Sequence, residues 1–319
     1  MSRQVAAERG ATGPMTVPAA PPARAVQRRP PTSPESETVA PLPPTAPAAP
    51  PTTHAAETDL ERLYGHLKRL SLHTIAQVLA DEARTAATTQ MSYTAFLARL
   101  MDVEIAAKAD RSVQARLSMA RFPVLRTLDE FDFTFQPGLA AARVKELAEL
   151  EFLSRAENVI FVGRPGTGKT HLATALAVRA CQARKRVLFL PAATLLDQLV
   201  AAEASHTLGR AVETLGRLDL LVVDELGYLP MDARGATLFF QLVSHLYTRT
   251  SVGLTTNVSF DGWGRVFGGD EVLAAAILDR LLHHSHVFHI TGPSYRMKDK
   301  LAGNAGAGSP GSGRGGADG

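Results

Sequence analysis

The chain has 319 residues, of which 45% are hydrophobic and 20% are charged, and its formal net charge is +3. This slight excess of positive charge permits a nucleic-acid partner but does not demonstrate one. No apolar run approaches the roughly 18 residues that span a bilayer, and the single cysteine, Cys181, is expected to be a small, half-buried thiol, so we expect a cytoplasmic protein without a membrane partner.

Both ends of the sequence have compositions that do not build a core. Residues 1–56 are rich in Pro, Ala and Thr and hold almost no large apolar side chains, so they cannot bury enough surface to offset the entropy of ordering. The arginines of this stretch adjoin no continuous apolar run, which argues against a secretory signal. Residues 302–319 are rich in Gly, Ser and Ala. We therefore expect a disordered arm over 1–56 and a disordered tail over 302–319.

Residues 57–123 show helical periodicity and are expected to form a small all-helical domain. Thr58 and Glu61 have the spacing of a capping box, and Ser92 is a candidate cap for a longer helix. The apolar positions expected on the inner faces are Leu60, Leu63, Tyr64, Leu67, Leu70, Ile75, Val78, Leu79, Phe96, Leu97, Leu100, Met101 and Ile105. Basic side chains follow at Lys108, Arg111, Arg116 and Arg121. These either form a solvated face or contact DNA or a partner protein.

Residues 124–301 alternate between strand and helix patterns. The expected elements are an extended segment at 128–135, helices at 139–153, 171–178, 193–203, 233–247 and 272–283, and strands at 158–162, 186–190, 218–223, 252–256 and 286–290. This alternation predicts an α/β fold, a parallel sheet with helices on both faces. Ligands of such sheets bind at the carboxyl ends of the strands.

A glycine-rich stretch matches the pattern G-x-x-x-x-G-K-[ST] between a predicted strand and a predicted helix. It consists of Gly163, Arg164, Pro165, Gly166, Thr167, Gly168, Lys169 and Thr170, which we call the phosphate loop, and His171 completes the expected nucleotide-binding set. Backbone N–H groups of such a loop cradle a polyphosphate at the helix N-terminus. Lys169 is expected to reach the β- and γ-phosphates, and the Thr170 hydroxyl to ligate Mg²⁺.

Two carboxylates end an apolar strand about fifty residues further on. Asp224 is expected near Mg²⁺, and Glu225 is placed to polarise the attacking water, because the strand delivers both to the sheet edge where the phosphates lie. The alternative is that the pair merely caps a turn before Gly227.

Two more polar residues are candidates for the same chemistry. Asn257 ends the next predicted strand, where it either hydrogen-bonds the γ-phosphate or the lytic water, or forms a turn. Arg280 lies on an otherwise apolar helix and either pairs with a buried carboxylate or serves as an arginine finger for a neighbouring subunit. The histidines that follow, at 283, 284, 286 and 289, have no Cys or carboxylate nearby, so we do not expect them to bind a metal.

The motifs together resemble the IstB-like ATPases, the transposition helpers of one insertion-sequence family, which belong to the AAA+ superfamily and are related to DnaC-type helicase loaders. The resemblance covers the folded region and rests on GRPGTGKTHLATAL (163–176), LDLLVVDELGYLPMDARGATLFFQLVSHLY (218–247), TTNVSFDGWGRVFGGDEVLAAAILDRLLHHSHVFHI (255–290) and SYRMKDK (294–300). The arm and the tail lie outside it. The chain ends too soon after SYRMKDK for a full helical lid, and Arg296 is the candidate for a sensor-2 arginine.

The resemblance implies an AAA+ ATPase that converts ATP and water to ADP and phosphate with Mg²⁺, and that is stimulated by DNA. It implies assembly as a homo-oligomer on double-stranded DNA, with ATP sites at subunit interfaces, and presentation of the deformed DNA to a cognate transposase. By this likeness Lys169 belongs to Walker A, Asp224 and Glu225 to Walker B, Asn257 is sensor 1 and Arg280 the arginine finger. The domain boundaries implied are 57–123 for the helical domain and 124–301 for the ATPase domain.

Two other functions share the same core motifs. A helicase loader would prefer single-stranded DNA and a replicative helicase, and the distinctive stretch 224–284 favours the transposition helper over it. A metabolic kinase with a phosphate loop would need a second substrate pocket and a lid, of which the sequence shows no sign.

Overall fold

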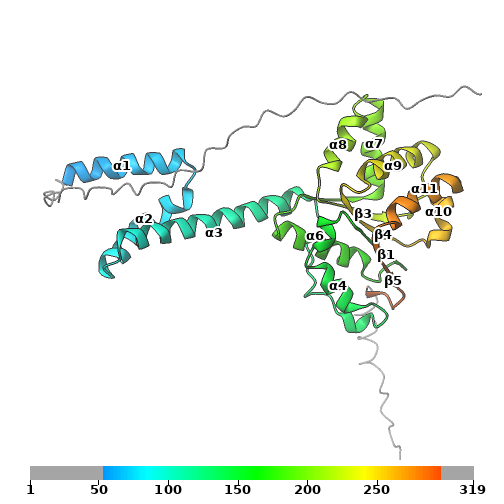
Figure 1. The fold of residues 1–319 in the computed structure, drawn as a ribbon, viewed down its shortest axis with the longest axis horizontal. Helices are drawn as coiled ribbons and strands as arrows, with labels where there is room; N and C mark the ends of the chain where they lie inside the picture. The colour runs from blue at the N-terminus through cyan, green and yellow to red at the C-terminus, as the bar shows by residue number, and fades with distance from the viewer. Residues whose placement is uncertain (1–52, 296–319) are drawn as a thin grey trace, which may run out of the picture. The chain divides into compact units, whose positions relative to one another are not determined.

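The computed structural model describes residues 53–295 (Figure 1). Most of the predicted arm, the predicted tail and the sensor-2 candidate Arg296 lie outside the described residues. The chain divides into two compact units, residues 1–60 and 61–319. Of the first unit, only the beginning of helix α1 is described.

The described part of the chain begins with three helices, α1 (Thr53–Arg69), α2 (His73–Thr88) and α3 (Tyr93–Met119). The predicted cap at Thr58 is wrong, because α1 begins five residues earlier and Thr58 lies inside it. The predicted cap at Ser92 is confirmed, since its Oγ accepts a hydrogen bond from the Ala95 N–H at 3.2 Å. The apolar face predicted for α3 is buried only in part, with Leu100 buried but Leu97, Met101 and Ile105 exposed.

The N-terminus of α2 is capped by a side chain from α3 rather than by its own sequence. Glu104 is only 2% exposed, and its Oε2 accepts hydrogen bonds from the Thr74 and Ile75 N–H groups at 2.8 and 3.0 Å. Its Oε1 accepts from the Arg111 guanidinium at 2.9 Å. Burial alone would raise the pKa of the Glu104 carboxyl, but these hydrogen bonds and the charge of Arg111 lower it below its usual 4.5. The carboxylate therefore holds α2 against α3 in its ionised form.

Removing this carboxylate should destabilise the α2–α3 pair. We expect Glu104→Ala to lower the free energy of unfolding by roughly 2 kcal/mol, because two helix N–H groups and a guanidinium lose their partner. Thermal unfolding, with amide exchange of α2 as a local reporter, measures the change. The matched control is Asp102→Ala, which removes an exposed carboxylate of the same helix.

The same contact predicts a pH dependence. Because the pKa of Glu104 is lower in the folded than in the unfolded protein, its stabilisation is complete above pH 4.5 and declines as the pH falls through the folded-state pKa. The stability difference between wild type and Glu104→Ala should therefore shrink in acid. An equal difference at about pH 7 and about pH 3 would contradict the assignment.

Five parallel strands form the sheet, in the order β2-β3-β4-β1-β5. They are β1 (Asn158–Gly163), β2 (Val187–Pro191), β3 (Leu220–Leu226), β4 (Ser251–Thr256) and β5 (Ser285–Ile290). The helices between them are α6 (Lys169–Gln182), α7 (Ala192–Ala204), α8 (Leu208–Gly216), α9 (Ala233–Leu246), η2 (Phe260–Gly262), α10 (Trp263–Val266) and α11 (Glu271–Leu282). The predicted α/β class is confirmed.

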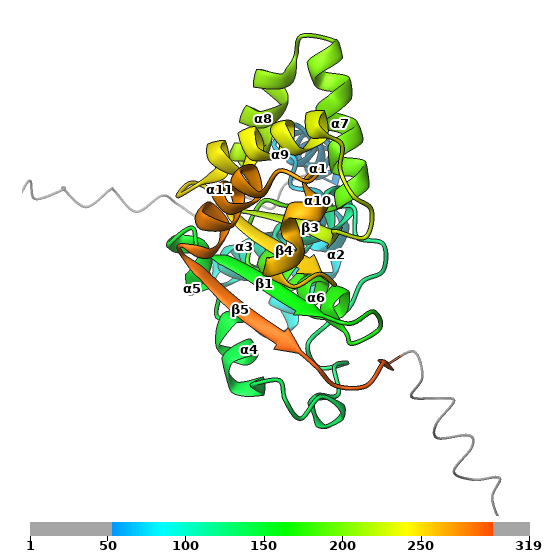
Figure 2. The ribbon, with the colours of Figure 1, turned by 90° about the vertical axis from the view of Figure 1, so that its right-hand side faces the viewer.

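Helices cover both faces of the sheet (Figure 2), and an apolar core lies on each face. On one face, α7, α8, α9, α10 and α11 pack over the strands, with Trp263, Phe239 and Phe267 fully buried among them. On the other face, α6 packs together with the short helices α4 (Ala141–Leu147) and α5 (Glu151–Ser154), around Phe161 and Phe189. Burial on both faces explains why β1 and the first half of β3 read as continuous apolar runs rather than alternating ones.

Three local predictions differ from the structure. The segment 128–135 is not extended throughout, since η1 (Phe133–Phe135) is a 3₁₀ turn begun by Asp132. The single helix predicted over 139–153 is interrupted at Leu150, whose φ of 65° is left-handed and cannot continue a helix. Helix α8 was not predicted, because Gly209 and Gly216 weaken the helical propensity of its sequence.

Candidate functional site

The phosphate loop joins β1 to α6 through two left-handed glycines. Strand β1 ends at Gly163 and α6 begins at Lys169. Gly166 and Gly168 have φ of 82° and 97°, which residues with a Cβ rarely adopt. A Cβ on Gly168 would also lie 2.7 Å from the Phe131 ring. The loop conformation therefore requires glycine at both positions, and α6 directs its N-terminal N–H groups and positive dipole end toward the loop.

Polar side chains of the loop hold its shape. The Lys169 ammonium group donates hydrogen bonds to the carbonyl oxygens of Gly163 at 2.7 Å and Arg164 at 2.9 Å. The Thr167 hydroxyl, which is 1% exposed, donates to the same Arg164 carbonyl at 2.9 Å. The ammonium group is thus kept against the loop, within reach of an anion bound there.

Asp224 lies at the end of β3 next to the phosphate loop. It is 6% exposed, and its Oδ1 accepts hydrogen bonds from the hydroxyls of Thr170 at 3.0 Å and Thr255 at 2.5 Å. A carboxylate beside a hydroxyl offers the hard oxygen ligands that Mg²⁺ prefers. The geometry therefore fits the magnesium ligands expected from the sequence, Thr170 and Asp224.

Glu225 follows Asp224 in an irregular part of β3. Its φ is 61°, and the pairing of β3 with β4 shifts between Val223 and Leu226. The side chain of Glu225 is exposed, and its backbone N–H donates to the Thr255 hydroxyl at 2.9 Å. Thr255 is thus in contact with both acidic residues, a role that the sequence did not indicate.

A cavity of about 640 Å³ connects these residues. Glu225 and Asn257 line it, together with six of the nine residues expected to bind nucleotide: Pro165, Gly166, Gly168, Lys169, Thr170 and His171. Gly163, Arg164 and Thr167 belong to the loop but do not line the cavity. Its volume lies within the usual range of small-molecule sites. The structure therefore brings together the phosphate loop, the acidic end of β3 and Asn257.

Segments before β1 and after β5 form another wall of the cavity. Tyr295 donates its N–H to the Gly166 carbonyl at 2.7 Å, and its hydroxyl donates to the Asp132 carbonyl. Burial raises the pKa of the Tyr295 phenol to about 12, so it remains a donor at neutral pH. His171 Nε2 lies 2.8 Å from the Thr127 carbonyl oxygen. These contacts over a long sequence separation had no signal in the sequence.

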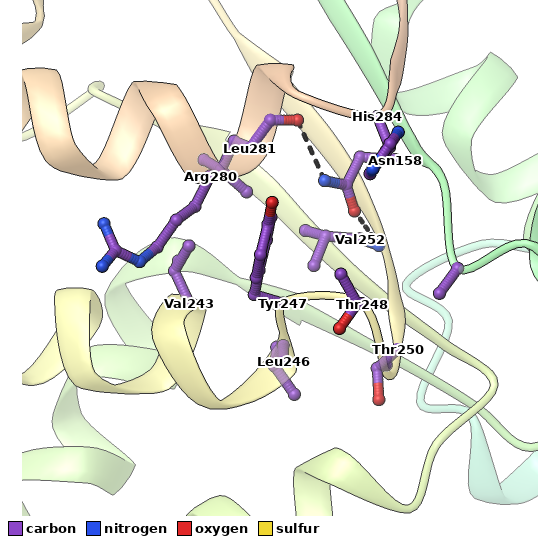
Figure 3. Close-up of a pocket in the computed structure, with 11 residues that line it drawn as sticks. Asn158, Val243, Leu246, Tyr247, Thr248, Thr250, Val252, Arg280, Leu281 and His284 are labelled. Atoms are coloured by element: carbon purple, nitrogen blue, oxygen red, sulfur yellow. Dashed lines mark hydrogen bonds between the residues drawn. The ribbon is translucent and has the colours of Figure 1, made fainter. Parts of the chain in front are cut away.

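Arg280 does not line this cavity but a separate hollow, which Figure 3 shows. It borders a small hollow with Asn158, the first residue of β1, whereas the phosphate loop follows the last residue of that strand. Its guanidinium lies over the Phe240 ring, 4.7 Å from the centroid, and Nη1 donates to the Ala276 carbonyl at 2.9 Å. In Figure 3 the side chain points away from Asn158. Within residues 53–295, no carboxylate forms an ion pair with Arg280.

The histidines near the end of α11 and Cys181 contact other side chains of the fold and not the cavity. His283 stacks on Tyr247 and interacts with its hydroxyl, and His286 pairs with Glu157 at 2.9 Å. In the described part of the chain, no group of three or more His, Cys, Asp or Glu side chains is placed to hold a metal ion. Cys181 is fully rather than half buried, and burial raises the pKa of its thiol to about 11. None of the helices between residues 53 and 295 has the length and apolarity to cross a membrane.

The chain is similar to ATP-binding proteins of insertion sequences. The insertion sequence IS21 putative ATP-binding protein of Pseudomonas aeruginosa is 45% identical over 242 residues, which cover 76% of this chain and 90% of the relative. The corresponding IS5376 protein of Geobacillus stearothermophilus is 39% identical over 240 residues, covering 75% and 95%. Among solved structures, AMPPCP-bound DnaA from Aquifex aeolicus has a TM-score of 0.46 and 22% identity, covering 58% of this chain and 55% of that one.

A protein-family model matches most of the chain. The model described as IstB-like ATP binding protein matches residues 65–303, a range that holds the phosphate loop, the acidic end of β3, Asn257 and Arg280. It also covers the end of α1 and all of α2 and α3. On these matches and on the geometry of the cavity, the chain belongs to the family of IstB-like ATP-binding proteins.

Proposed function

We propose that this protein is an ATPase that assembles on double-stranded DNA with ATP, remodels the DNA and regulates or recruits a partner transposase. The observation that supports it best is the meeting of the phosphate loop and Glu225 at one cavity, with Asp224 accepting a hydrogen bond from the cavity-lining Thr170. Family membership and the insertion-sequence names of the relatives support the transposition role. In this proposal hydrolysis is the switch that ends the DNA-bound state.

The phosphate loop would bind the triphosphate of ATP. The N–H groups of the loop and the N-terminus of α6 supply donors and a positive dipole end. Lys169 would exchange its two loop carbonyls for the β- and γ-phosphate oxygens, which lie within the reach of a lysine side chain. Thr170 and Asp224 would hold Mg²⁺, which neutralises charge on the phosphates when bound.

Glu225 and Asn257 would act on the water that attacks the γ-phosphate. Both line the cavity, and the side chain of Glu225 is exposed in the irregular part of β3. The carboxylate would accept a proton from the water as it attacks, and the amide of Asn257 would hydrogen-bond the γ-phosphate or the water. The bond between the γ-phosphorus and the oxygen that bridges it to the β-phosphate would break, and ADP would leave with the charge on its β-phosphate compensated by Lys169.

Arg280 would complete the site of a neighbouring subunit. Arg280 lies near the start of β1, and the phosphate loop follows the end of that strand. This separation favours action in trans over action on the ATP of its own chain. An interface of this kind joins two different surfaces of the same protein, so it generates rings or helical filaments. Assembly and hydrolysis would then be coupled.

The helical segment 57–123 would contact the transposase or pack against other subunits. Three apolar side chains four residues apart along α3, Leu97, Met101 and Ile105, are exposed there. Contiguous exposed apolar residues on a helix often mark protein contacts. The boundary proposed at 123/124 lies four residues after the end of α3 at Met119.

The mass of the complex on DNA tests the proposed assembly. We expect the hydrolysis-deficient variant Glu225→Gln, with ATP, to form a large complex on duplex DNA and none of that size on single-stranded DNA of equal length. Omission of ATP is the control and should abolish the complex. Preference for the single strand, or assembly only with a replicative helicase, would replace the transposition helper with a helicase loader.

A further inference from the structure

The hydroxyl of Thr255 contacts both acidic residues of the site. Thr255 is the penultimate residue of β4, in the middle of the sheet, and it is 0% exposed. Its Oγ1 lies 2.5 Å from Asp224 Oδ1 and 2.9 Å from the Glu225 backbone nitrogen. A single buried atom thus joins the carboxylate expected at Mg²⁺ to the backbone of the residue expected to activate water.

The strand pairing explains why this contact is needed. Val223 pairs with Leu254 and Leu226 pairs with Thr256, so two residues of β3 stand opposite Thr255 alone. This is a β-bulge, and it reorients a side chain that regular alternation would place on the opposite face from its neighbour. Glu225, one of the two bulged residues, has the left-handed φ of 61°. The bulge allows Asp224 and Glu225 to serve one site.

A bulge also leaves a backbone N–H without its partner in the ladder, and here Thr255 supplies the acceptor. The direction of each hydrogen bond follows from chemistry. The backbone N–H of Glu225 can only donate, so the hydroxyl accepts from it with a lone pair, and its one proton goes to the Asp224 carboxylate. Removal of the hydroxyl would therefore take one hydrogen bond from Asp224, which keeps its bond from Thr170, and would leave the Glu225 N–H without this acceptor.

We propose that Thr255 is a positioning residue that fixes the bulge at Glu225 and the carboxylate of Asp224 as one unit. The expected effects on ATP hydrolysis rest on the proposed ATPase function. The expected effect on the backbone at Glu225 does not. We expect loss of the hydroxyl to change the local backbone at Glu225, the use of Mg²⁺ and the rate of hydrolysis, and to leave the binding of the triphosphate to the loop nearly unchanged.

Three substitutions separate the hydroxyl from side-chain shape and general stability. Thr255→Val keeps the branched shape without the hydroxyl, and Thr255→Ser keeps the hydroxyl without the methyl group. Thr250→Val is the matched control, because Thr250 is 2% exposed, lies directly before the same strand and donates its hydroxyl to the Gly216 carbonyl at 3.1 Å. Melting temperatures of the three variants show whether their folds are comparably stable.

Amide exchange in the nucleotide-free protein tests the structural content directly. We expect the Glu225 amide to exchange at least about tenfold faster in Thr255→Val than in wild type, because it loses its acceptor. Thr255→Ser and Thr250→Val should retain slow exchange at this amide. Unchanged exchange at Glu225 in Thr255→Val would overturn the proposal, whatever the enzyme does with ATP.

Kinetics and nucleotide binding test the consequence. In Thr255→Val we expect kcat to fall about 10- to 100-fold with the KM for ATP within about threefold, and the Mg²⁺ concentration for half-maximal rate to rise several-fold. The ratio of the ATP affinity with Mg²⁺ to the ATP affinity without Mg²⁺ should be smaller in this variant than in wild type. Thr255→Ser should remain within about threefold of wild type in each measurement. Wild-type kinetics in Thr255→Val, beside an inactive Glu225→Gln, would refute the positioning role and leave the ATPase function standing, whereas a wild type without turnover would refute the function itself.

Discussion

The variant Glu225→Gln is expected to hydrolyse ATP at least about 100-fold more slowly than wild type, because an amide cannot accept the proton of the attacking water. Its affinity for ATP should stay within about threefold, since Lys169 and Thr170 remain in place. Glutamine has nearly the same shape as glutamate, and the backbone N–H that bonds Thr255 is retained. Steady-state phosphate release and equilibrium binding of ATP measure the two quantities.

The matched control for this variant is Glu146→Gln, an exposed carboxylate on α4 that does not line the cavity. It should hydrolyse ATP as wild type does. Turnover of Glu225→Gln at the wild-type rate would remove Glu225 from catalysis and leave the capping of the following turn as its role. Loss of ATP binding in this variant would instead show that the carboxylate supports the fold of the loop.

The main parts of the site could be predicted because each is encoded locally. The phosphate loop is a continuous stretch whose glycines, lysine and threonine have fixed spacing, and the flanking strand and helix have clear periodicity. Asp224 and Glu225 could be placed because a buried parallel strand delivers the residues at its carboxyl end to one edge of the sheet. The structure confirms this fold, and it places Glu225 at the same cavity as the phosphate loop, with Asp224 bonded to the loop residue Thr170.

The residues that sequence reasoning missed act over long separations. Thr255 is an ordinary β-branched residue in a strand, and nothing in its neighbourhood shows that it stands opposite a bulge in another strand. The bulge itself is hidden, because its left-handed residue is Glu225 and not the glycine that usually marks such a position. Tyr295 bonds Gly166 from 129 residues further along the chain (295 − 166), and Phe131 lies against Gly168 from 37 residues before it (168 − 131). Pairwise contacts of this kind require the tertiary structure.

The variant Arg280→Ala is expected to lose DNA-stimulated hydrolysis by about 1000-fold, while each subunit still binds ATP. The reason is that the guanidinium would supply charge to the γ-phosphate of a neighbouring subunit, a contact that alanine cannot replace. Arg280→Lys should recover only part of the rate, because lysine lacks the planar fork. The control is Arg249→Ala, an exposed arginine just before β4, which should keep the wild-type rate. Packing over Phe240 is lost too, so melting temperatures must accompany the rates.

Mixing two inactive variants distinguishes action in trans from action in cis. A subunit with Arg280→Ala keeps its own Glu225, and a subunit with Glu225→Gln keeps its own Arg280. If Arg280 acts on the neighbour, an equal mixture should regain activity, because about a quarter of the heterologous interfaces then join an intact Glu225 to an intact Arg280. If Arg280 acts within its own chain, every site in the mixture still lacks one group. A mixture as inactive as its components, under conditions in which mixed oligomers form, would therefore assign Arg280 to its own subunit or to packing against Phe240.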